Sequence, residues 1–336
     1  MILAADLGGT KCVISLLDPA TFACAREQVY RCAEHASLEA IVADFLAAPA
    51  SGSLVGACFA VAGMIDASGR SAKITNLPWT IDAERLRAQL GGIPVSLLND
   101  LQATALGSLV LTADQVAHLQ HGAGPEQGTI AVIAPGTGLG EAVLVSDGTR
   151  YRALPSEGGH ADFAPTSDDE IELLRFLRRK YGHHVSNERV LCGNGLGDLY
   201  DFVRRTGDAE PAWLTAEMAD RDRNAVIAQV ALAKRDAACM RALEMFAEVL
   251  GAEAGNQALR AMATGGVVIG GGIAPKILPA LQTGALVERF CAKGRFASWM
   301  KTLSVRVALE PRTALLGAAH HVASELRHAR EKRVNA

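Results

Sequence analysis

Residues 2–11 read ILAADLGGTK, an apolar run that ends in an acid, two glycines, a threonine and a lysine. The run Ile2–Leu7 predicts a buried β-strand, because it is short, continuous and bounded by a turn signal. The glycine pair predicts a tight turn, and Val13–Leu17 predicts the antiparallel partner of the first strand. The chain therefore begins with a strand, a glycine turn and a second strand.

The residues of this turn suit a phosphate group. Without side chains, the backbone N–H groups of Gly8 and Gly9 can approach a phosphate closely. Asp6 can hold Mg²⁺ through water, Thr10 can donate its hydroxyl to the terminal phosphate, and Lys11 adds positive charge. A hairpin whose glycines merely permit positive φ is an equally good interpretation of this piece alone.

The same unit recurs near residue 136. Thr129–Ala134 predicts a strand, residues 135–140 read PGTGLG, and Glu141–Val145 predicts a second strand. The turn is not a dinucleotide fingerprint, because residue 141 is Glu rather than Gly and a strand follows instead of a helix. Two such turns can bind a triphosphate from both sides of a cleft. In the second turn, the binding residues would be Gly136, Thr137 and Gly138. The recurrence suggests two domains built on one plan.

Strand and helix patterns alternate along the rest of the chain, which is typical of an α/β protein. Further strands are predicted at Leu54–Ala62, Val95–Leu98 and Val267–Ile269. Helices are predicted at Ser37–Ala48, Asp82–Leu90, Leu101–Leu111, Asp168–Lys180, Gly195–Arg205, Asn224 to about Met262, and Thr313–Leu326. The basic tail after the last helix, Arg327 to Arg333, is interpreted as a solvated helix end.

Asp100 lies where a predicted strand ends and a helix begins, the place where open α/β sheets bind ligands. A carboxylate there can accept the proton of a substrate hydroxyl while that oxygen attacks phosphorus. The alternative is structural: Asn99 with Gln102 three residues later resembles a capping box. Taken in isolation, the cap is the better interpretation of these residues.

A third group of polar residues suits a sugar. Residues 154–160 read LPSEGGH, and Asn187-Glu188-Arg189 follows further on. Glu157 and His160 flank a Gly-Gly turn that can aim both side chains into one pocket, and such planar groups bond adjacent sugar hydroxyls. A metal role for His160 is disfavoured, because no Cys or second His stands at ligand spacing.

Residues 270–272 read GGG after the strand predicted at Val267–Ile269. Such a turn lets a flat base or a ribose lie against bare backbone. A simple tight turn is the better interpretation when this piece is taken alone.

Composition limits the class of protein. With 336 residues, the chain is long enough for two domains, and its net charge of −3 provides no basic field for nucleic acid or anionic lipid. The seven cysteines are scattered without a C-x-x-C pair, which favours reduced thiols. The first residues lack the basic region of a signal peptide, and the longest apolar run, 54–65, is shorter than the roughly 20 residues of a membrane span. We therefore expect a cytoplasmic protein.

Taken in order, these pieces resemble the bacterial glucokinase family, within the hexokinase, actin and Hsp70 superfamily. The resemblance runs from end to end of the chain. It is carried by DLGGTK (6–11), ITNLPW (74–79), NDLQA (99–103), PGTGLGEAVLV (135–145), LPSEGGHADFAP (154–165), HVSNERVLCG (184–193), VVIGGGIAP (267–275), KGRF (293–296) and ALLGAA (314–319).

The resemblance implies a two-domain actin-like ATPase (ribonuclease H-like) α/β fold with its active site in the interdomain cleft. The smaller domain would be 1–110 plus 301–330, and the larger 111–300. It also implies a homodimer and transfer of the γ-phosphoryl group of ATP to the 6-hydroxyl of glucose, the first step of glycolysis.

The resemblance further implies roles for individual residues. Asp100 would be the general base and contact the hexose, and further hexose ligands would be Asn99, Glu157, His160 and Glu188, with Asn76 near the same pocket. The phosphates and Mg²⁺ would be held by Asp6, Gly8, Gly9, Thr10, Lys11, Gly136, Thr137 and Gly138. Gly271 and Gly272 would lie by the adenosine.

Two departures from related patterns are visible. The related repressor–kinase sugar family has a cysteine-rich zinc motif after its sugar-binding His, whereas this chain has no Cys between Cys58 and Cys192. Pro135 and Ser156 stand where close glucokinases often carry Gly or Ala, which bears on fine specificity. The alternatives are a kinase for another hexose or an amino sugar, a non-catalytic sugar-sensing regulator, and an ATP-driven clamp of the Hsp70 or actin type.

Overall fold

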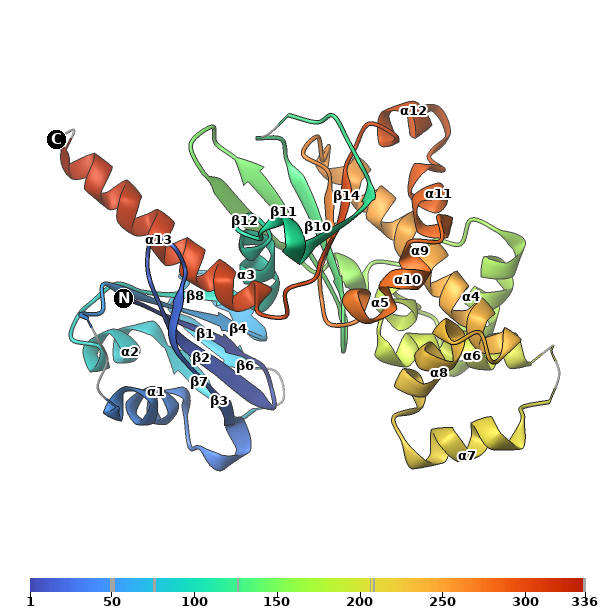
Figure 1. Ribbon diagram of the computed structural model, residues 1–336, viewed down its shortest axis with the longest axis horizontal. Coiled ribbons are helices and arrows are strands. Elements are labelled where there is room, and N and C mark those ends of the chain that lie inside the picture. Colours follow the sequence, from blue (N-terminus) through green and yellow to red (C-terminus); the bar gives the residue numbers. More distant parts are fainter. Residues whose placement is uncertain (49–51, 75–76, 126, 206, 208, 335–336) are drawn as a thin grey trace. The chain divides into compact units, whose positions relative to one another are not determined.

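The computed structural model describes residues 1–48, 52–74, 77–125, 127–205, 207 and 209–334, and these form two compact units (Figure 1). Unit 1 comprises Met1–Thr112, Asp147–Pro155 and Glu310–Ala336. Unit 2 comprises Ala113–Ser146 and Ser156–Leu309. The mixed α/β class predicted from the sequence is confirmed.

Unit 1 is built on a five-stranded sheet in the order β3-β2-β1-β4-β8. Its strands are β1 (Ile2–Leu7), β2 (Lys11–Leu17), β3 (Cys24–Arg31), β4 (Gly56–Val61) and β8 (Val95–Asn99). The strands β1 and β2 form the expected antiparallel hairpin, while β1, β4 and β8 run parallel. Every residue of β4 is buried, as expected for a central parallel strand with helices on its faces.

A small antiparallel sheet and four helices complete unit 1. The sheet contains β5 (Gly63–Ile65), β6 (Ser71–Ile74) and β7 (Thr80–Asp82), and β12 (Tyr151–Ser156) also lies mostly in this unit. The helices are α1 (Leu38–Ala47), α2 (Ala83–Gln89), α3 (Asp100–Gly107) and α13 (Thr313–Val334), and η1 (Cys32–Glu34) is a short 3-10 turn. Helix α1 buries residues at helical spacing on one face, namely Leu38, Ile41, Val42 and Phe45.

Helix α13 packs against α3, β1 and β4, and lies beside α3 in Figure 1. The two helices touch at backbone level, because glycines face each other at the crossing. A Cβ atom on Gly107 would lie 1.9 Å from the Thr313 carbonyl oxygen, and one on Gly317 would lie 1.7 Å from the Ala103 oxygen. This close contact fixes the position of α3, the helix that begins at Asp100.

Unit 2 repeats the strand arrangement of unit 1. Its strands are hydrogen-bonded to one another in the order β11-β10-β13-β14-β9. Their bounds are β9 (Val116–Gln120), β10 (Ile130–Pro135), β11 (Leu139–Ser146), β13 (Val267–Ile269) and β14 (Val305–Ala308). As in unit 1, a hairpin, β10–β11, is extended by parallel strands, β13 and then β14. The recurrence of strand, glycine turn and strand predicted from the sequence is confirmed.

The helices of unit 2 surround a long central one, α9 (Ala237–Ala261), which is buried around most of its surface. It packs against α6, α8 and α11. The other helices are α4 (Asp168–Tyr181), α5 (Asn187–Val190), α6 (Gly193–Arg204), α7 (Ala212–Asp220), α8 (Arg223–Leu232), α10 (Leu278–Leu281), α11 (Ala285–Cys291) and α12 (Ala297–Met300). Short 3-10 turns are η2 (Ala113–Gln115), η3 (Gly158–His160), η4 (Ala274–Ile277) and η5 (Gly294–Phe296).

The continuous helix predicted from Asn224 to about Met262 is wrong. The structure has two helices there, because α8 ends at Leu232 and Lys234 adopts a left-handed φ of 56°. Asp236 then starts α9, since its carboxylate accepts the N–H of Cys239 at 2.9 Å. Apolar spacing continues across the break, so periodicity alone does not reveal it.

Other boundaries also differ from the predictions. Helix α3 ends at Gly107 rather than Leu111, and the Ser108 hydroxyl bonds the Ala105 carbonyl at its end. Helix α13 continues through the predicted basic tail to Val334. The strands β3, β5, β6, β7, β9, β12 and β14 were not predicted, as most are short or carry exposed polar residues.

The expected domain bounds, 1–110 with 301–330 and 111–300, remain a prediction. The units differ from them at two places: Asp147–Pro155 groups with unit 1, and the residues up to Leu309 group with unit 2. The second difference follows from β14, which pairs with β13 and β9. No helix within the described ranges is both long enough and apolar enough to span a bilayer.

Candidate active site

Parallel pairing brings Asp6 and Asp100 to the same edge of the unit 1 sheet. Leu7 lies in register with Val61, and Val61 with Asn99, so that the two acids stand at the carboxyl ends of β1 and β8. Burial raises the pKa of Asp6 to about 6, and the negative charge of Asp100 adds to this effect. The two carboxylates are therefore close enough to interact.

No side chain covers the backbone of the Gly8-Gly9 turn, but the Gly8 N–H expected to face a phosphate instead donates to the Lys11 oxygen at 3.0 Å. Neither glycine has a positive φ, so the explanation that they only relieve a left-handed turn is wrong. A Cβ atom on Gly8 would meet nothing nearer than the Lys11 oxygen at 3.6 Å, so internal packing does not require glycine there. Thr10 is exposed, and its hydroxyl makes no hydrogen bond to any residue that the structure describes. Bare backbone and a free hydroxyl are what a phosphate needs.

The capping box predicted as the alternative role of Asn99 is present. The side chain of Asn99 accepts the N–H of Leu101 at 2.9 Å, and Gln102 Oε1 accepts the N–H of Asn99 at 3.2 Å. Asn99 Nδ2 also donates to the Gly63 carbonyl at 3.3 Å. The cap accounts for Asn99 and Gln102, whereas Asp100 is the first residue of α3 and half-buried at the sheet edge. Asp100 Oδ1 also accepts the N–H of Leu101, at 2.9 Å. Its role as a base stays a prediction.

In unit 2, Glu188 lies between the second glycine turn and the polar residues at 154–160 that are predicted to bind a sugar. Its Oε2 atom accepts the N–H of Leu139 at 3.0 Å, and a Cβ atom on Gly138 would lie 2.4 Å from that oxygen. A side chain at Gly138 would therefore push the Glu188 carboxylate away from the turn. A Cβ atom on Gly136 would meet nothing nearer than 3.9 Å, and Thr137 is exposed. Like Gly8 in the first turn, Gly136 thus has free space on the side where a Cβ atom would lie.

His160 lies between two carboxylates. Its Nε2 atom is 3.8 Å from Glu157 Oε2, and its Nδ1 atom is 3.9 Å from Glu188 Oε1. These separations exceed those of hydrogen bonds, so the three side chains do not bond one another. Apart from Glu188 Oε2, which accepts the Leu139 N–H, their polar atoms remain available to another molecule. The side chains of Glu157 and His160 are largely exposed, at 87% and 58%. The structure thus brings together three of the predicted hexose ligands beside the second glycine turn.

The third glycine turn is adjacent to the second. Because β10 and β13 are parallel with Ile133 opposite Ile269, Gly270–Gly272 leaves the sheet beside Pro135. Gly271 has a φ of 78°, and a Cβ atom on it would lie 2.4 Å from the Pro135 oxygen, so its glycine is required structurally. A Cβ atom on Gly272 would have nothing within 4 Å. Of the two, Gly272 offers the open surface that a nucleoside could cover.

Two predicted site features lie beyond what the structure describes. Asn76 falls outside the described residues. In the part of the chain that is described, no group of three or more His, Cys, Asp or Glu is placed to hold a metal ion. Contact of Asp6 with Mg²⁺ through water, which needs only one protein carboxylate, stays a prediction.

Sequence reasoning missed Glu141, which lies next to Gly158, among the residues predicted to bind a sugar. It is buried in β11, and a Cβ atom on Gly158 would lie 2.0 Å from its Oε2 atom. Burial raises the pKa of Glu141 to about 7, and the charge of Glu253 acts in the same direction. The available signal was an acid among the apolar residues of a predicted strand.

We expect Glu141→Gln to flatten the dependence of stability on pH. The pKa of about 7 in the folded protein exceeds the ordinary value of 4.5 for a glutamate. The stabilisation from this group is therefore complete below pH 4.5 and lost as pH rises through 7, each pKa unit being worth about 1.4 kcal/mol. Urea unfolding between pH 4 and pH 8 measures the effect. Glu172→Gln, at an exposed site, should leave the slope unchanged, and an unaltered slope in Glu141→Gln would contradict the pKa.

The chain matches the family model described as Glucokinase over residues 3–325. It is 37% identical to the glucokinase of Nostoc punctiforme, with 95% of this chain and 98% of that protein covered. It is 34% identical to the glucokinase of Hahella chejuensis, with 97% and 98% covered.

Among solved structures, the chain is similar to a glucokinase from an Antarctic psychrotroph, with a TM-score of 0.83 and 31% identity. That match covers 96% of this chain and 98% of the other. Because a family model spans nearly the whole chain and relatives above 30% identity are covered almost completely, this protein belongs to the glucokinase family.

Proposed function

We propose that the chain is an ATP-dependent glucokinase that transfers the γ-phosphoryl group of ATP to the 6-hydroxyl of D-glucose, giving glucose 6-phosphate and ADP. Membership of the family supports this activity. The observation that carries it is the position of Glu188, whose carboxylate bonds the second glycine turn at Leu139 and lies 3.9 Å from His160. The Glu188 side chain thereby lies between His160, which suits a sugar hydroxyl, and the second glycine turn, which suits a phosphate.

In the proposed mechanism Asp100 accepts the proton of the 6-hydroxyl as that oxygen attacks the γ-phosphorus and the bond to ADP breaks. Asn99, Glu157, His160 and Glu188 bond the other hydroxyls, with Asn76 near them. Of these, Asn99 already accepts the N–H of Leu101 at the start of α3 and donates to the Gly63 carbonyl. It can therefore form with the sugar only the hydrogen bonds that these two leave unused. Catalysis by this set is mostly positioning of the two reactants.

The phosphates would be held by the two open turns, Gly8 to Lys11 and Gly136 to Gly138. The N–H groups of Gly8 and Gly136 already donate to the oxygens of Lys11 and Gly138, at 3.0 and 2.8 Å. The other N–H groups of the two turns and the threonine hydroxyls would therefore bind the phosphate oxygens, and Gly271 and Gly272 would lie by the adenosine. Mg²⁺, when bound, neutralises negative charge on the phosphates. The interacting carboxylates Asp6 and Asp100 suit a nearby cation, which would lower their repulsion, and Asp6 would reach it through water.

The proposal includes the actin-like two-domain fold with substrates in the cleft between domains. Closure over the sugar would exclude water and limit hydrolysis of ATP. A homodimer and a cytoplasmic location are also part of the proposal. Light scattering on the eluted peak of a gel-filtration column would test the dimer, and a mass of one chain, 35.3 kDa, would contradict it.

A coupled ADP-release assay across glucose, mannose, fructose and N-acetylglucosamine tests the proposed activity. We expect the highest kcat/KM with glucose. A better acceptor among the others would replace glucose as the substrate, because one epimeric hydroxyl changes only one or two hydrogen bonds. Release of ADP with none of them, together with tight sugar binding in a calorimeter, would favour the sugar-sensing alternative.

We expect Gly136→Ala to raise KM for ATP at least tenfold while leaving the fold intact. The new methyl group meets nothing nearer than 3.9 Å within the protein, so the free energy of unfolding should change by less than about 0.5 kcal/mol. It would instead occupy the surface that the phosphates approach. Steady-state kinetics with varied ATP, together with urea unfolding, measures both effects. The kinetic control is Gly207→Ala, at an exposed site where the new Cβ atom meets nothing nearer than the Val203 oxygen at 3.6 Å. An unchanged KM in Gly136→Ala would remove this turn from the site.

A further inference from the structure

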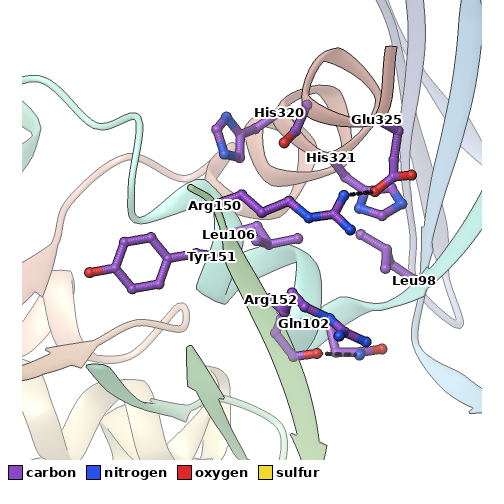
Figure 2. Close-up of a pocket in the computed structure, with 11 residues that line it drawn as sticks. Leu98, Gln102, Leu106, Arg150, Tyr151, Arg152, His320, His321 and Glu325 are labelled. Atoms are coloured by element: carbon purple, nitrogen blue, oxygen red, sulfur yellow. Dashed lines mark hydrogen bonds and ion pairs between the residues drawn. The ribbon is translucent and has the colours of Figure 1, made fainter. Parts of the chain in front are cut away.

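A cavity of about 270 Å³ lies in unit 1, apart from the residues proposed to bind glucose and ATP. Its walls come from α3, the segment 150–153 and α13, as Figure 2 shows. The volume is slightly below the roughly 300–1,000 Å³ typical of ligand pockets, which suits a small metabolite. Polar and charged side chains from all three walls reach the cavity.

The cavity has more positive than negative charge. Arg150 extends across it toward Glu325, with 2.6 Å between Nη1 and Oε1, so these two charges balance (Figure 2). Arg152 also lines the cavity, is exposed, and forms no ion pair or hydrogen bond with the residues that the structure describes. Glu325 is the acid of the lining, so one guanidinium is left without a counter-charge.

Two histidines of α13 form the wall next to Arg150. Burial lowers the pKa of His320 to about 4, with Arg327 and His321 adding to the effect, and burial also lowers the pKa of His321. Both imidazoles are therefore neutral at pH 7. The Nδ1 atom of His320 is buried without a hydrogen-bond partner in the described part of the chain, which is costly unless another molecule supplies one. Ser324, one turn further, adds a hydroxyl to the lining.

We propose that this cavity binds a small phosphate monoester, with Arg152 as its main anchor and Arg150 and Ser324 as further donors. A phosphate monoester carries up to two negative charges and three acceptor oxygens at neutral pH, so it can accept hydrogen bonds from several directions at once. The guanidinium fork matches two of those oxygens. A carboxylate has two oxygens in one plane and uses fewer of the donors.

The cavity contacts the catalytic helix through Gln102. This side chain lines the cavity, accepts the N–H of Asn99 at 3.2 Å, and donates to the Ala153 carbonyl at 3.0 Å. It thereby connects the start of α3, where Asp100 lies, to the segment that leads into the sugar group at 156–160. An occupant that moves Gln102 or Ala153 changes the support of Asp100, so the site is regulatory. This second part rests on the proposed function, whereas binding does not.

Calorimetry on the full chain tests binding, with sn-glycerol 3-phosphate as the probe and malonate as the carboxylate comparison. Saturating glucose and ADP are present so that the candidate active site is filled. We expect the phosphate probe to bind more tightly than malonate, and Arg152→Ala to weaken it about tenfold or more. Arg85→Ala removes another exposed arginine, from α2, and should leave the affinity unchanged.

Four results would overturn the binding site: no heat from the phosphate probe, binding abolished by glucose with ADP, equal or tighter binding of malonate, or equal loss of affinity in the two arginine variants. These outcomes are independent of the kinase activity. Inorganic phosphate as a second probe shows whether the ester group contributes.

The regulatory part has its own readout. In the unmodified protein, sn-glycerol 3-phosphate should change kcat/KM for glucose by severalfold, and in Arg152→Ala the same concentration should change it much less. A probe that binds in the calorimeter but leaves kcat/KM unchanged would overturn the coupling through Gln102. An equal change in the unmodified protein and in Arg152→Ala would do the same.

Discussion

Asp100→Asn should lower kcat by about 10²–10⁴-fold while glucose still binds. Asn has the same shape but cannot accept the proton of the 6-hydroxyl. Its side-chain oxygen can still accept the N–H of Leu101, which Asp100 does at 2.9 Å, so α3 should keep its start. Steady-state kinetics gives kcat, and calorimetry with glucose separates loss of chemistry from loss of binding.

The matched control is Asp82→Asn at the start of α2. Asp82 bonds the N–H groups of Glu84 and Arg85, and Asn caps helices as well as Asp does. This variant removes an acid from a helix start in the same unit, and its kcat should be normal. If Asp100→Asn retained a kcat close to that of the unmodified protein, Asp100 would not be the base.

Gly317→Ala should destabilise the protein by about 3 kcal/mol, at the upper end of the cost of overpacking. The new Cβ atom would lie 1.7 Å from the Ala103 oxygen, and backbone rather than a flexible side chain would have to move. Displacing α13 from α3 also disturbs the helix that begins at Asp100, so kcat should fall as well. Urea unfolding followed by circular dichroism gives the change in stability.

Two other glycine variants test this prediction, one at the same helix crossing and one at a site with free space. Gly107→Ala, whose Cβ atom would lie 1.9 Å from the Thr313 oxygen at the same crossing, should destabilise to a similar extent. Gly272→Ala, with nothing within 4 Å, should unfold like the unmodified protein. Equal stability of Gly317→Ala and Gly272→Ala would show that the helices can separate at little cost.

The strands that carry the glycine turns were predictable because their signal is local. The prediction of Ile2–Leu7 is confirmed to the residue, as is that of Val267–Ile269, since each is a short, mainly apolar run followed by glycine. The break between α8 and α9 was not predictable, because apolar spacing continues across Lys234 and only a left-handed residue and the Asp236 cap interrupt the helix. Short strands such as β14 have too few residues for a pattern.

For the candidate site, local sequence identified the residue types but not their partners. The sequence by itself determined the α/β class, the paired glycine turns and the family, since these depend on neighbours along the chain. Tertiary structure alone decided that Glu188 supports the second turn, that Glu141 lies buried under Gly158, and that Gln102 connects a cavity to the helix of Asp100. Each of these contacts joins segments distant in sequence, and no local pattern records which distant segments packing and strand pairing bring together.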